Sequence, residues 1–197
     1  MIREIVRKNR SYRRYDQSKK ISESELKELI DIGRMTPSGA NKQPIRYFLS
    51  NTEDVNARIF ETLKWAGYLK DWEGPVEGER PAAYIILLAP KNINSAHDEG
   101  IIGQTILLAA VEKGMGGCFI ANIDRDRLRS NLNISSECDI KLVLALGYPK
   151  EKVVMDEISK EDDIKYYRDK NMVHHVPKIK LEDLILNDLH QNNKQSQ

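Results

Sequence analysis

The chain has 197 residues and a mass of 22.7 kDa, which suffices for one domain with a sizeable core and leaves little room for a second. Apolar residues make up 40% and charged residues 31%, as in an ordinary globular protein, and a net charge of +1 gives no overall attraction to nucleic acid or membranes. The cysteines, Cys118 and Cys138, do not form a disulfide framework and no signal segment opens the chain, so we expect a cytoplasmic protein.

The first half of the chain predicts helices around a loop and a strand. Ser22 and Glu25 have capping-box spacing, and the apolar residues after them recur at helical intervals. Proline and glycine then break this pattern, which is typical of a loop. The predicted elements are a short helix starting near Ile2, a helix over 23–35, a loop over 36–44, a strand over 45–50 and a helix marked by Val55, Ile59, Leu63 and Ala66.

The second half is expected to supply a central strand and a core helix. Residues 82–89 are apolar on both faces, which is typical of a central strand. A helix starting at Asp98 is apolar almost all round over 101–111, so we expect it to be buried, and Gly114 can end it. This stretch is far short of the roughly 20 residues that a membrane helix needs. The other predicted elements are a long loop over 68–81, a strand over 118–121, a polar helix over 124–132 and a buried strand over 140–146.

Strands and helices are interspersed, with connections too irregular for a doubly wound sheet. We therefore predict an α+β fold with a central mixed β-sheet flanked by helices. No repeat or linker divides the chain, so a single domain over 1–189 is expected. The tail over 190–197 has no apolar residue to bury and is expected to be disordered.

The N-terminal 20 residues hold a local excess of positive charge, +6, whereas the rest of the chain carries −5. Arg10 and Arg13 are three positions apart and share a side if the helical geometry continues, with the hydroxyl of Ser11 beside them. Guanidinium forks with an adjacent hydroxyl match the oxygens of a phosphate. A solvated basic helix end explains the same charges, and it is favoured when this segment is taken alone.

The loop that follows the second predicted helix combines stiffness with hydrogen-bonding groups. Pro37 and Pro44 enclose the hydroxyl of Ser38 and the carboxamides of Asn41 and Gln43. Carboxamides present donors and acceptors together, which suits the edge of a heterocycle. A simple turn between a helix and a strand explains the prolines and glycine equally well.

Residues 114–118, Gly-Met-Gly-Gly-Cys, have three glycines that leave room for a flat ring or a phosphate against the backbone. The segment is neither a Walker sequence nor a Gly-x-Gly-x-x-Gly fingerprint, so a tight turn is the favoured interpretation of it alone. We expect no metal site, because the adjacent His174 and His175 diverge in a regular element and no Cys-x-x-Cys is present. Cys118 is expected to be a small buried residue.

Taken together and in this order, these segments resemble the nitroreductase family of flavoproteins. The resemblance covers about residues 2–187, and the motifs are individually weak but strong as an ordered set. The matching segments are Arg10-Ser-Tyr-Arg13 with Tyr15, residues 37–44, Asp98-Glu-Gly100 with Gln104 and 107–110, residues 114–118, Ala145-Leu-Gly-Tyr-Pro149 and residues 176–182.

This resemblance implies a homodimer of α+β chains with FMN bound tightly and non-covalently at the subunit interface. It further implies that the flavin carries the chemistry, so that no side chain acts as nucleophile or dedicated acid. The residues implied to bind FMN are Arg10, Ser11 and Arg13 at the phosphate and ribityl chain, assisted by Lys178 or Lys180; Pro37, Ser38, Asn41 and Gln43 of the other subunit at the isoalloxazine edge; and Gly116 and Gly117 close to the ring.

The implied activity is hydride transfer from NAD(P)H through flavin N5 to a nitro-aromatic, quinone or similar small acceptor by a ping-pong mechanism. The alternatives are a specialised relative, such as a reductive dehalogenase or a flavin-modifying enzyme, and a flavin store or sensor without turnover. A dehalogenase needs a lid, for which the loop over 68–81 with Trp72 as a substrate contact is the candidate. The chain departs from the family at Asn9 and Ile179, where many members carry arginine.

Overall fold

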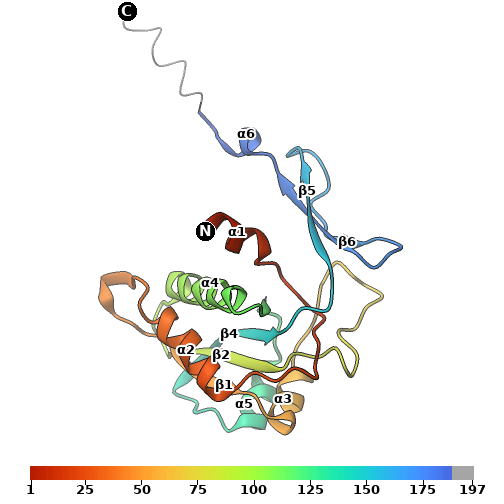
Figure 1. Ribbon diagram of the computed structural model, residues 1–197. Coiled ribbons are helices and arrows are strands. Elements are labelled where there is room, and N and C mark those ends of the chain that lie inside the picture. The colour runs from red at the N-terminus through yellow and green to blue at the C-terminus, as the bar shows by residue number, and fades with distance from the viewer. Residues whose placement is uncertain (188–197) are drawn as a thin grey trace, which may run out of the picture. The chain divides into compact units, whose positions relative to one another are not determined.

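The computed structural model describes residues 1–187, so the predicted tail over 190–197 lies outside the described residues. The chain divides into two compact units, Met1–Glu151 and Lys152 onward. It has the predicted α+β composition (Figure 1). The single domain over 1–189 stays a prediction. Among residues 1–187 no helix combines the length and apolar character that crossing a membrane requires.

The first unit is built on a four-stranded sheet in the order β1 (Arg46–Ser50), β2 (Ala83–Pro90), β4 (Cys138–Gly147) and β3 (Gly116–Ile120). All three ladders between these strands are antiparallel. A parallel bridge from Ser11 to Gly117 lies outside the named strands, next to β3. The prediction that residues 82–89 form a central strand is confirmed, because β2 lies between two strands and all but its last residue are buried.

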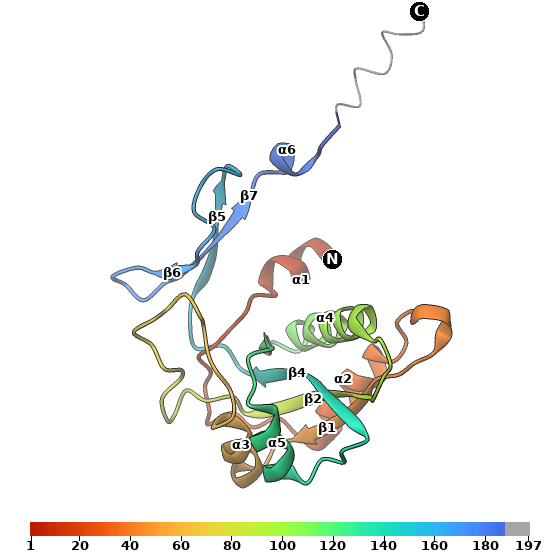
Figure 2. The same ribbon diagram turned by 180° about the vertical axis from the view of Figure 1, so that it is seen from behind.

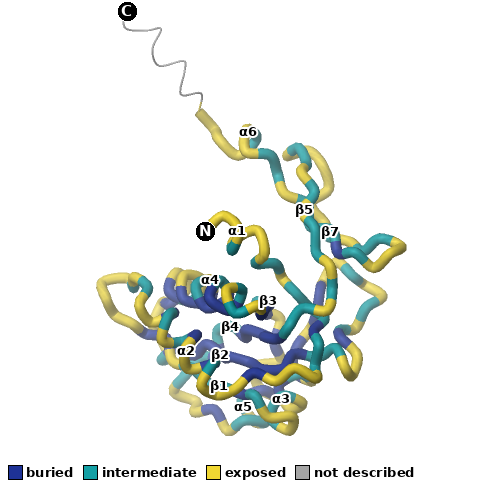
Figure 3. The backbone as a smooth tube through the Cα atoms, in the orientation of Figure 1, coloured by how far each residue is buried: buried dark blue, intermediate teal, exposed yellow. Residues whose placement is uncertain are grey.

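Helices cover both faces of this sheet (Figures 1 and 2). Alternate residues of β2 point to opposite faces, so Ile85 and Leu87 belong to one apolar cluster and Tyr84 and Ile86 to the other. The first cluster includes side chains of α2 (Glu23–Gly33) and α4 (Ala96–Glu112). The second includes side chains of α3 (Glu53–Phe60) and α5 (Arg125–Leu132). Figure 3 shows the buried strands between these layers.

Local signals account for most helix boundaries. The Ser22 side chain accepts from the Glu25 N–H while the Glu25 carboxylate accepts from the Ser22 N–H, so the predicted capping box begins α2. The third helix is shorter than predicted and ends at Phe60. Its chain turns away there because the N–H and hydroxyl of Thr62 both donate to the Ile59 carbonyl, and Ala66 takes a left-handed φ of 38°.

Helix α4 is a core helix as predicted, and it is buried on one side only. Ile102, Ile106 and Ala110 face the sheet, whereas the side chain of Ile101 is 42% exposed. Gln104, Leu108 and Val111 continue this partly exposed stripe at helical spacing. The short helix α1 (Ile2–Lys8) packs on α4 and buries none of its own residues. The outer side of α4 and the side chains of α1 therefore present apolar groups to solvent.

The second unit contains a smaller sheet that the sequence patterns did not predict. Its strands are β5 (Val153–Ile158), β7 (His174–Ile179) and β6 (Tyr167–Arg168), and a short helix α6 (Leu181–Leu184) follows. Strand β7 is parallel to β5 and antiparallel to β6. The adjacent histidines differ as expected: His174 is buried, whereas His175 Nδ1 lies 2.9 Å from Asp156 Oδ2. Within residues 1–187 no cluster of potential ligands has the geometry to hold a metal ion.

Candidate functional site

The basic segment after α1 lies against β3, and this brings three predicted site residues together. Ser11 forms the bridge to Gly117, and the Tyr12 N–H donates to the Gly117 carbonyl over 3.1 Å. A Cβ added to Gly116 would lie 2.5 Å from Cδ2 of the Tyr12 ring, so the ring packs directly on this glycine. Tyr15 is fully buried behind the segment and pairs with Pro149. Ser11, Gly116 and Gly117 are therefore neighbours despite their separation in sequence.

Arg10 and Arg13 lie in this segment with donors suited to an anion. Arg10 Nη2 donates to the Val6 carbonyl over 2.6 Å, while its Nε is buried and has no hydrogen-bond partner among the described residues. Burial lowers the pKa of Arg10 from its ordinary value, because the desolvated guanidinium is harder to charge. Arg13 Nη1 donates to the Ser11 carbonyl over 3.3 Å. The helix ends at Lys8 and Asn9 is extended, so Arg10 and Arg13 do not share a helix face as a continued helix would have required. The buried Nε–H of Arg10 is nevertheless a donor of the kind that a phosphate accepts.

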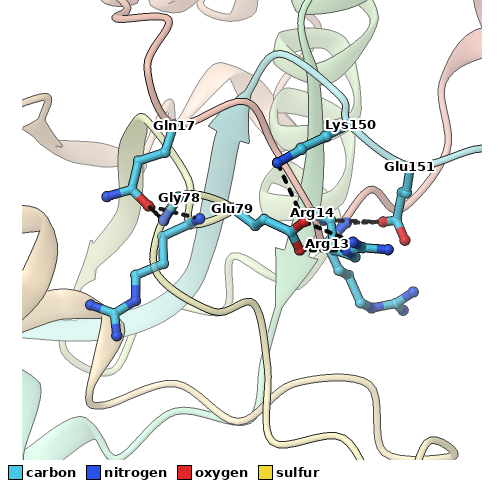
Figure 4. A network of polar contacts seen from close by, with 8 residues as sticks. Arg13, Arg14, Gln17, Gly78, Glu79, Lys150 and Glu151 are labelled. Carbon is cyan, nitrogen blue, oxygen red and sulfur yellow. Dashed lines mark hydrogen bonds and ion pairs between the residues drawn. The ribbon is translucent and has the colours of Figure 1, made fainter.

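Two acidic residues that no sequence motif indicated hold the same segment (Figure 4). The Glu151 carboxylate accepts from the backbone N–H groups of Arg13 and Arg14. The Arg14 guanidinium binds Glu79 with two hydrogen bonds of 2.5 and 2.7 Å, and Lys150 Nζ lies 3.5 Å from the same carboxylate. Arg14 therefore points to a protein carboxylate and is not available as a second anion ligand.

The glycines near β3 have a packing role that the sequence could not indicate. A Cβ on Gly117 would lie 2.5 Å from Leu107 Cδ2 and 2.8 Å from the Ala145 carbonyl oxygen. Protein atoms thus already fill the space next to the Cα of Gly117. A ligand could therefore contact Gly116 and Gly117 through their backbone atoms alone. Cys118 is buried as expected, and desolvation raises the pKa of its thiol, which disfavours a reactive thiolate.

The loop over 36–44 projects from the other end of α4. Ala40, Asn41 and Gln43 take left-handed φ values of 50°, 54° and 45°, a strained arrangement for residues with side chains. The Gln43 N–H donates to Ser38 Oγ over 2.9 Å, and the Gly39 N–H donates to Asp98 Oδ1 over 3.2 Å. The carboxamides of Asn41 and Gln43 are exposed, next to an open depression of about 560 Å³ that Pro37, Ser38 and the start of α4 line.

The predicted flavin residues thus form two groups at opposite ends of α4. The loop group contacts Asp98 in the first turn of the helix, whereas Gly116 and Gly117 begin the strand after its last residue, Glu112. A helix of 17 residues is about 25 Å long, so both groups of one chain cannot surround the same ring. Figures 1 and 2 show the loop, in orange, at the α4 end away from the chain after α1.

The remaining predicted residues lie elsewhere. Trp72 is half-buried against the apolar cluster on the sheet face opposite α4, and it lines an open depression with residues of the α3 end. Lys178 and Lys180 belong to the second unit, where Lys178 is exposed on β7 and Lys180 precedes α6. The roles assigned to these three residues stay predictions.

Sequence patterns missed Glu79, Glu151 and the contact made by Asp98. Glu151 and Arg13 are 138 positions apart, and Glu79 and Arg14 are 65 apart, so no local spacing links them. Asp98 begins the predicted core helix and belongs to a segment that resembles the family, but neither observation indicates its contact with the Gly39 N–H. Asp98 is only 6% exposed, and an isolated buried carboxylate is costly, but this burial is a property of the fold that no sequence pattern gives.

Comparisons with known proteins identify the family and the fold. The sequence model of the Nitroreductase family matches residues 6–148. An iodotyrosine deiodinase of Thermotoga neapolitana is 25% identical over 171 residues, covering 77% of this chain and 90% of the relative. The crystal structure of an iodotyrosine deiodinase bound to FMN and 3-iodo-L-tyrosine superposes with a TM-score of 0.64 at 21% identity, covering 86% and 96% of the two chains. An FMN-dependent nitroreductase of Mycobacterium smegmatis in complex with NADPH gives a TM-score of 0.60 at 16% identity, covering 75% and 87%.

Proposed function

The chain belongs to the nitroreductase family, and from that premise we propose that it is an FMN-dependent oxidoreductase working as a homodimer. The chemistry that FMN supplies is hydride transfer at N5, from NAD(P)H to a nitro-aromatic, quinone or similar small acceptor in ping-pong order. The residues of this chain bind and orient the cofactor and the two substrates.

The donor set at β3 supports FMN as the cofactor. Arg10 offers a buried Nε–H that has no acceptor within residues 1–187, and Ser11 and Arg13 follow it in the same segment. A phosphate monoester accepts several charge-assisted hydrogen bonds at once, so it satisfies this buried donor better than a water molecule does. Arg10, Ser11 and Arg13 would hold the phosphate end, with Lys178 or Lys180 as a further candidate.

The division of the site residues along α4 is the observation that carries the dimer proposal. Two chains packed through the partly exposed stripe of α4 in opposite directions bring the loop of one chain to the β3 end of the other. Pro37, Ser38, Asn41 and Gln43 of one subunit then edge the flavin whose phosphate the other subunit holds. The exposed apolar residues Ile2 and Val6 on α1 and Ile101 on α4 supply surface that an interface would bury.

Within such a site the side chains of this chain would hold and orient the flavin ring. The amides of Asn41 and Gln43 have donors and acceptors for a heterocycle edge, and both residues are exposed. Backbone donors and amides near the ring would stabilise negative charge that develops there. Cys118 stays a thiol, and the redox step needs neither a side-chain nucleophile nor a dedicated acid.

Anaerobic reduction of the purified yellow protein by NADH and by NADPH tests this proposal. We expect one or both to bleach the flavin absorbance, and a panel of nitro-aromatic and quinone acceptors to restore it. Bound flavin that neither nicotinamide reduces would support the store or sensor. Purified protein that neither carries nor takes up FMN would overturn the proposal.

A second candidate is a reductive dehalogenase acting on a halogenated aromatic compound. The similarity to the Thermotoga deiodinase, which extends over 90% of that relative, favours it. In this case the loop over 68–81 would act as the lid and Trp72 would contact the substrate. Adding an iodinated phenol to the acceptor panel separates the two candidates, because only a dehalogenase releases iodide while it reoxidises the flavin.

A further inference from the structure

The backbone of the basic segment is fixed by a carboxylate from the far end of the first unit. Glu151 accepts hydrogen bonds from two successive N–H groups, at 2.5 Å from Arg13 and 3.2 Å from Arg14. The neighbouring Lys150 N–H donates back to the Arg14 carbonyl over 3.0 Å. Three hydrogen bonds thus join residues 13–14 to residues 150–151, beyond the end of β4.

Glu79 binds Arg14 and Tyr15 of the same segment. Its carboxylate forms the two hydrogen bonds with Arg14, and its carbonyl accepts from the Tyr15 N–H over 2.9 Å. The Arg14 and Glu79 side chains are only 23% and 13% exposed, so solvent competes little for these contacts. Figure 4 shows the segment between Glu79 and the pair Lys150 and Glu151.

Two carboxylates, those of Glu79 and Glu151, contact the segment that is proposed to bind an anion. Placing carboxylates beside a phosphate site costs affinity unless they contribute something else. The network of Arg14, Glu79, Lys150 and Glu151 holds two cations and two carboxylates, so it adds no net charge. Its contribution is therefore geometric: it fixes the backbone of the segment from which Arg10 and Arg13 extend.

We propose that Glu151 is a positioning residue for the anion-binding segment, and that Glu79 assists by keeping Arg14 out of the site. The inference rests on the proposed function, because the anion is taken to be the FMN phosphate. A preorganised segment loses little conformational freedom when the ligand binds, whereas a loose segment must be ordered at the expense of affinity. Removing Glu151 should therefore weaken binding of the phosphate and spare the rest of the flavin.

The test compares FMN with riboflavin, which has the same ring and ribityl chain but no phosphate. Titration of apoprotein followed by flavin fluorescence gives both dissociation constants for wild type, Glu151→Ala, Glu151→Gln and the control Glu137→Ala, an exposed acidic residue of the same unit. Glu151→Ala should weaken FMN binding about tenfold and riboflavin binding by less than about twofold. Glu151→Gln keeps an acceptor oxygen for both N–H groups and should restore FMN affinity. The control should match wild type.

The outcomes separate this inference from the proposed function. Wild type that binds FMN no tighter than riboflavin overturns the phosphate anchor, and the inference with it. A wild-type preference for FMN that Glu151→Ala leaves intact overturns only the inference. Equal losses for both ligands in Glu151→Ala indicate general destabilisation and also overturn it. If Glu151→Ala does not fold, Glu151→Asp replaces it, because the shorter side chain withdraws the carboxylate from both N–H groups and should selectively weaken FMN binding.

Discussion

The segment over 10–17, which holds Arg10, Ser11 and Arg13, and the loop over 36–44 are both expected to touch the same cofactor, yet the fold supports them in opposite ways. Every backbone N–H from Tyr12 to Gln17 donates to a residue at least 60 positions away, on β3, beyond β4 or in the loop over 68–81. In the other loop the N–H groups of Asn41, Lys42 and Gln43 donate only to residues within the loop. Its long-range backbone contact is the one from Gly39 to Asp98.

The contrast between long-range backbone hydrogen bonds in the first segment and local ones in the loop indicates what each contributes to a shared site. The first segment is ordered by its own chain and can offer a preformed anion site before any partner arrives. The loop keeps three left-handed residues and exposed carboxamides with little support, which is costly in an isolated chain. A partner subunit that covers the loop would remove that cost. The comparison therefore predicts that one chain suffices for the phosphate end, whereas the ring requires two.

Subunit mixing between defective variants tests this division and has the largest expected effect. Arg13→Ala removes one of the anion donors, and Asn41→Ala removes a ring contact that belongs to the other subunit, so each homodimer should lose its activity at an FMN concentration that fills only intact sites. After subunit exchange, each mixed dimer has one intact site, so about a quarter of all sites should regain flavin-dependent activity. Light scattering should give twice the mass of one chain.

A matched pair provides the control for subunit mixing. Arg10→Ala and Arg13→Ala damage the same half of the site, so their mixed dimer contains no intact site and should stay inactive. Recovery in this control would mean that exchange repairs folding and not the shared site. A monomeric flavoprotein, or no recovery between Arg13→Ala and Asn41→Ala after verified exchange, would contradict the division.

Replacing the two neighbouring arginines separates binding from support within the first segment. Arg13→Ala should weaken FMN binding by about 1.5–3 kcal/mol, because it deletes a charge-assisted contact. Arg14→Ala should instead lower the free energy of unfolding, by about 1–3 kcal/mol, because the largely buried Glu79 carboxylate then loses two short hydrogen bonds and keeps the longer contact to Lys150. FMN titration and urea unfolding of both variants measure the two effects, and equal FMN losses would contradict the separation.

The sequence predicted the two motifs but not what supports them. Local periodicity identified α2, β2 and α4, and the ordered motifs indicated FMN, because these signals lie within short windows. The contacts of Glu79 and Glu151 depend on the strand order, which no window contains. The same limitation explains the missed sheet of β5, β6 and β7, whose short strands mix polar and apolar residues. The third helix was overextended because Leu63 and Ala66 are spaced for a helix although the chain turns at Thr62.

Replacing one glycine in each region by alanine should change the stability of the protein to different extents. A Cβ on Gly117 meets Leu107 and the Ala145 carbonyl, so Gly117→Ala should destabilise the protein by about 1–3 kcal/mol. A Cβ on Gly39 meets no atom of its own chain within 4 Å, so Gly39→Ala should change stability by less than about 0.5 kcal/mol. Thermal unfolding of the apoproteins measures both changes. A destabilised Gly39→Ala variant would show that its loop is supported after all.

The contact between Glu79 and Arg14 should make the stability of the first segment depend on pH. The hydrogen bonds from Arg14 lower the pKa of Glu79 from its ordinary value of 4.5. A carboxyl whose pKa is lower in the folded state stabilises that state fully above its unfolded pKa, and the contribution disappears as the pH falls through the lowered value. Wild type should therefore exceed Glu79→Gln in unfolding free energy by about 1 kcal/mol at neutral pH. Urea unfolding should show that this gap narrows as the pH falls below about 4.5 and closes once the pH is below the lowered pKa, while the exposed control Glu137→Gln shows no such gap. A gap that widens on acidification would mean that the protonated carboxyl is the stabilising form, and that the carboxylate does not hold Arg14.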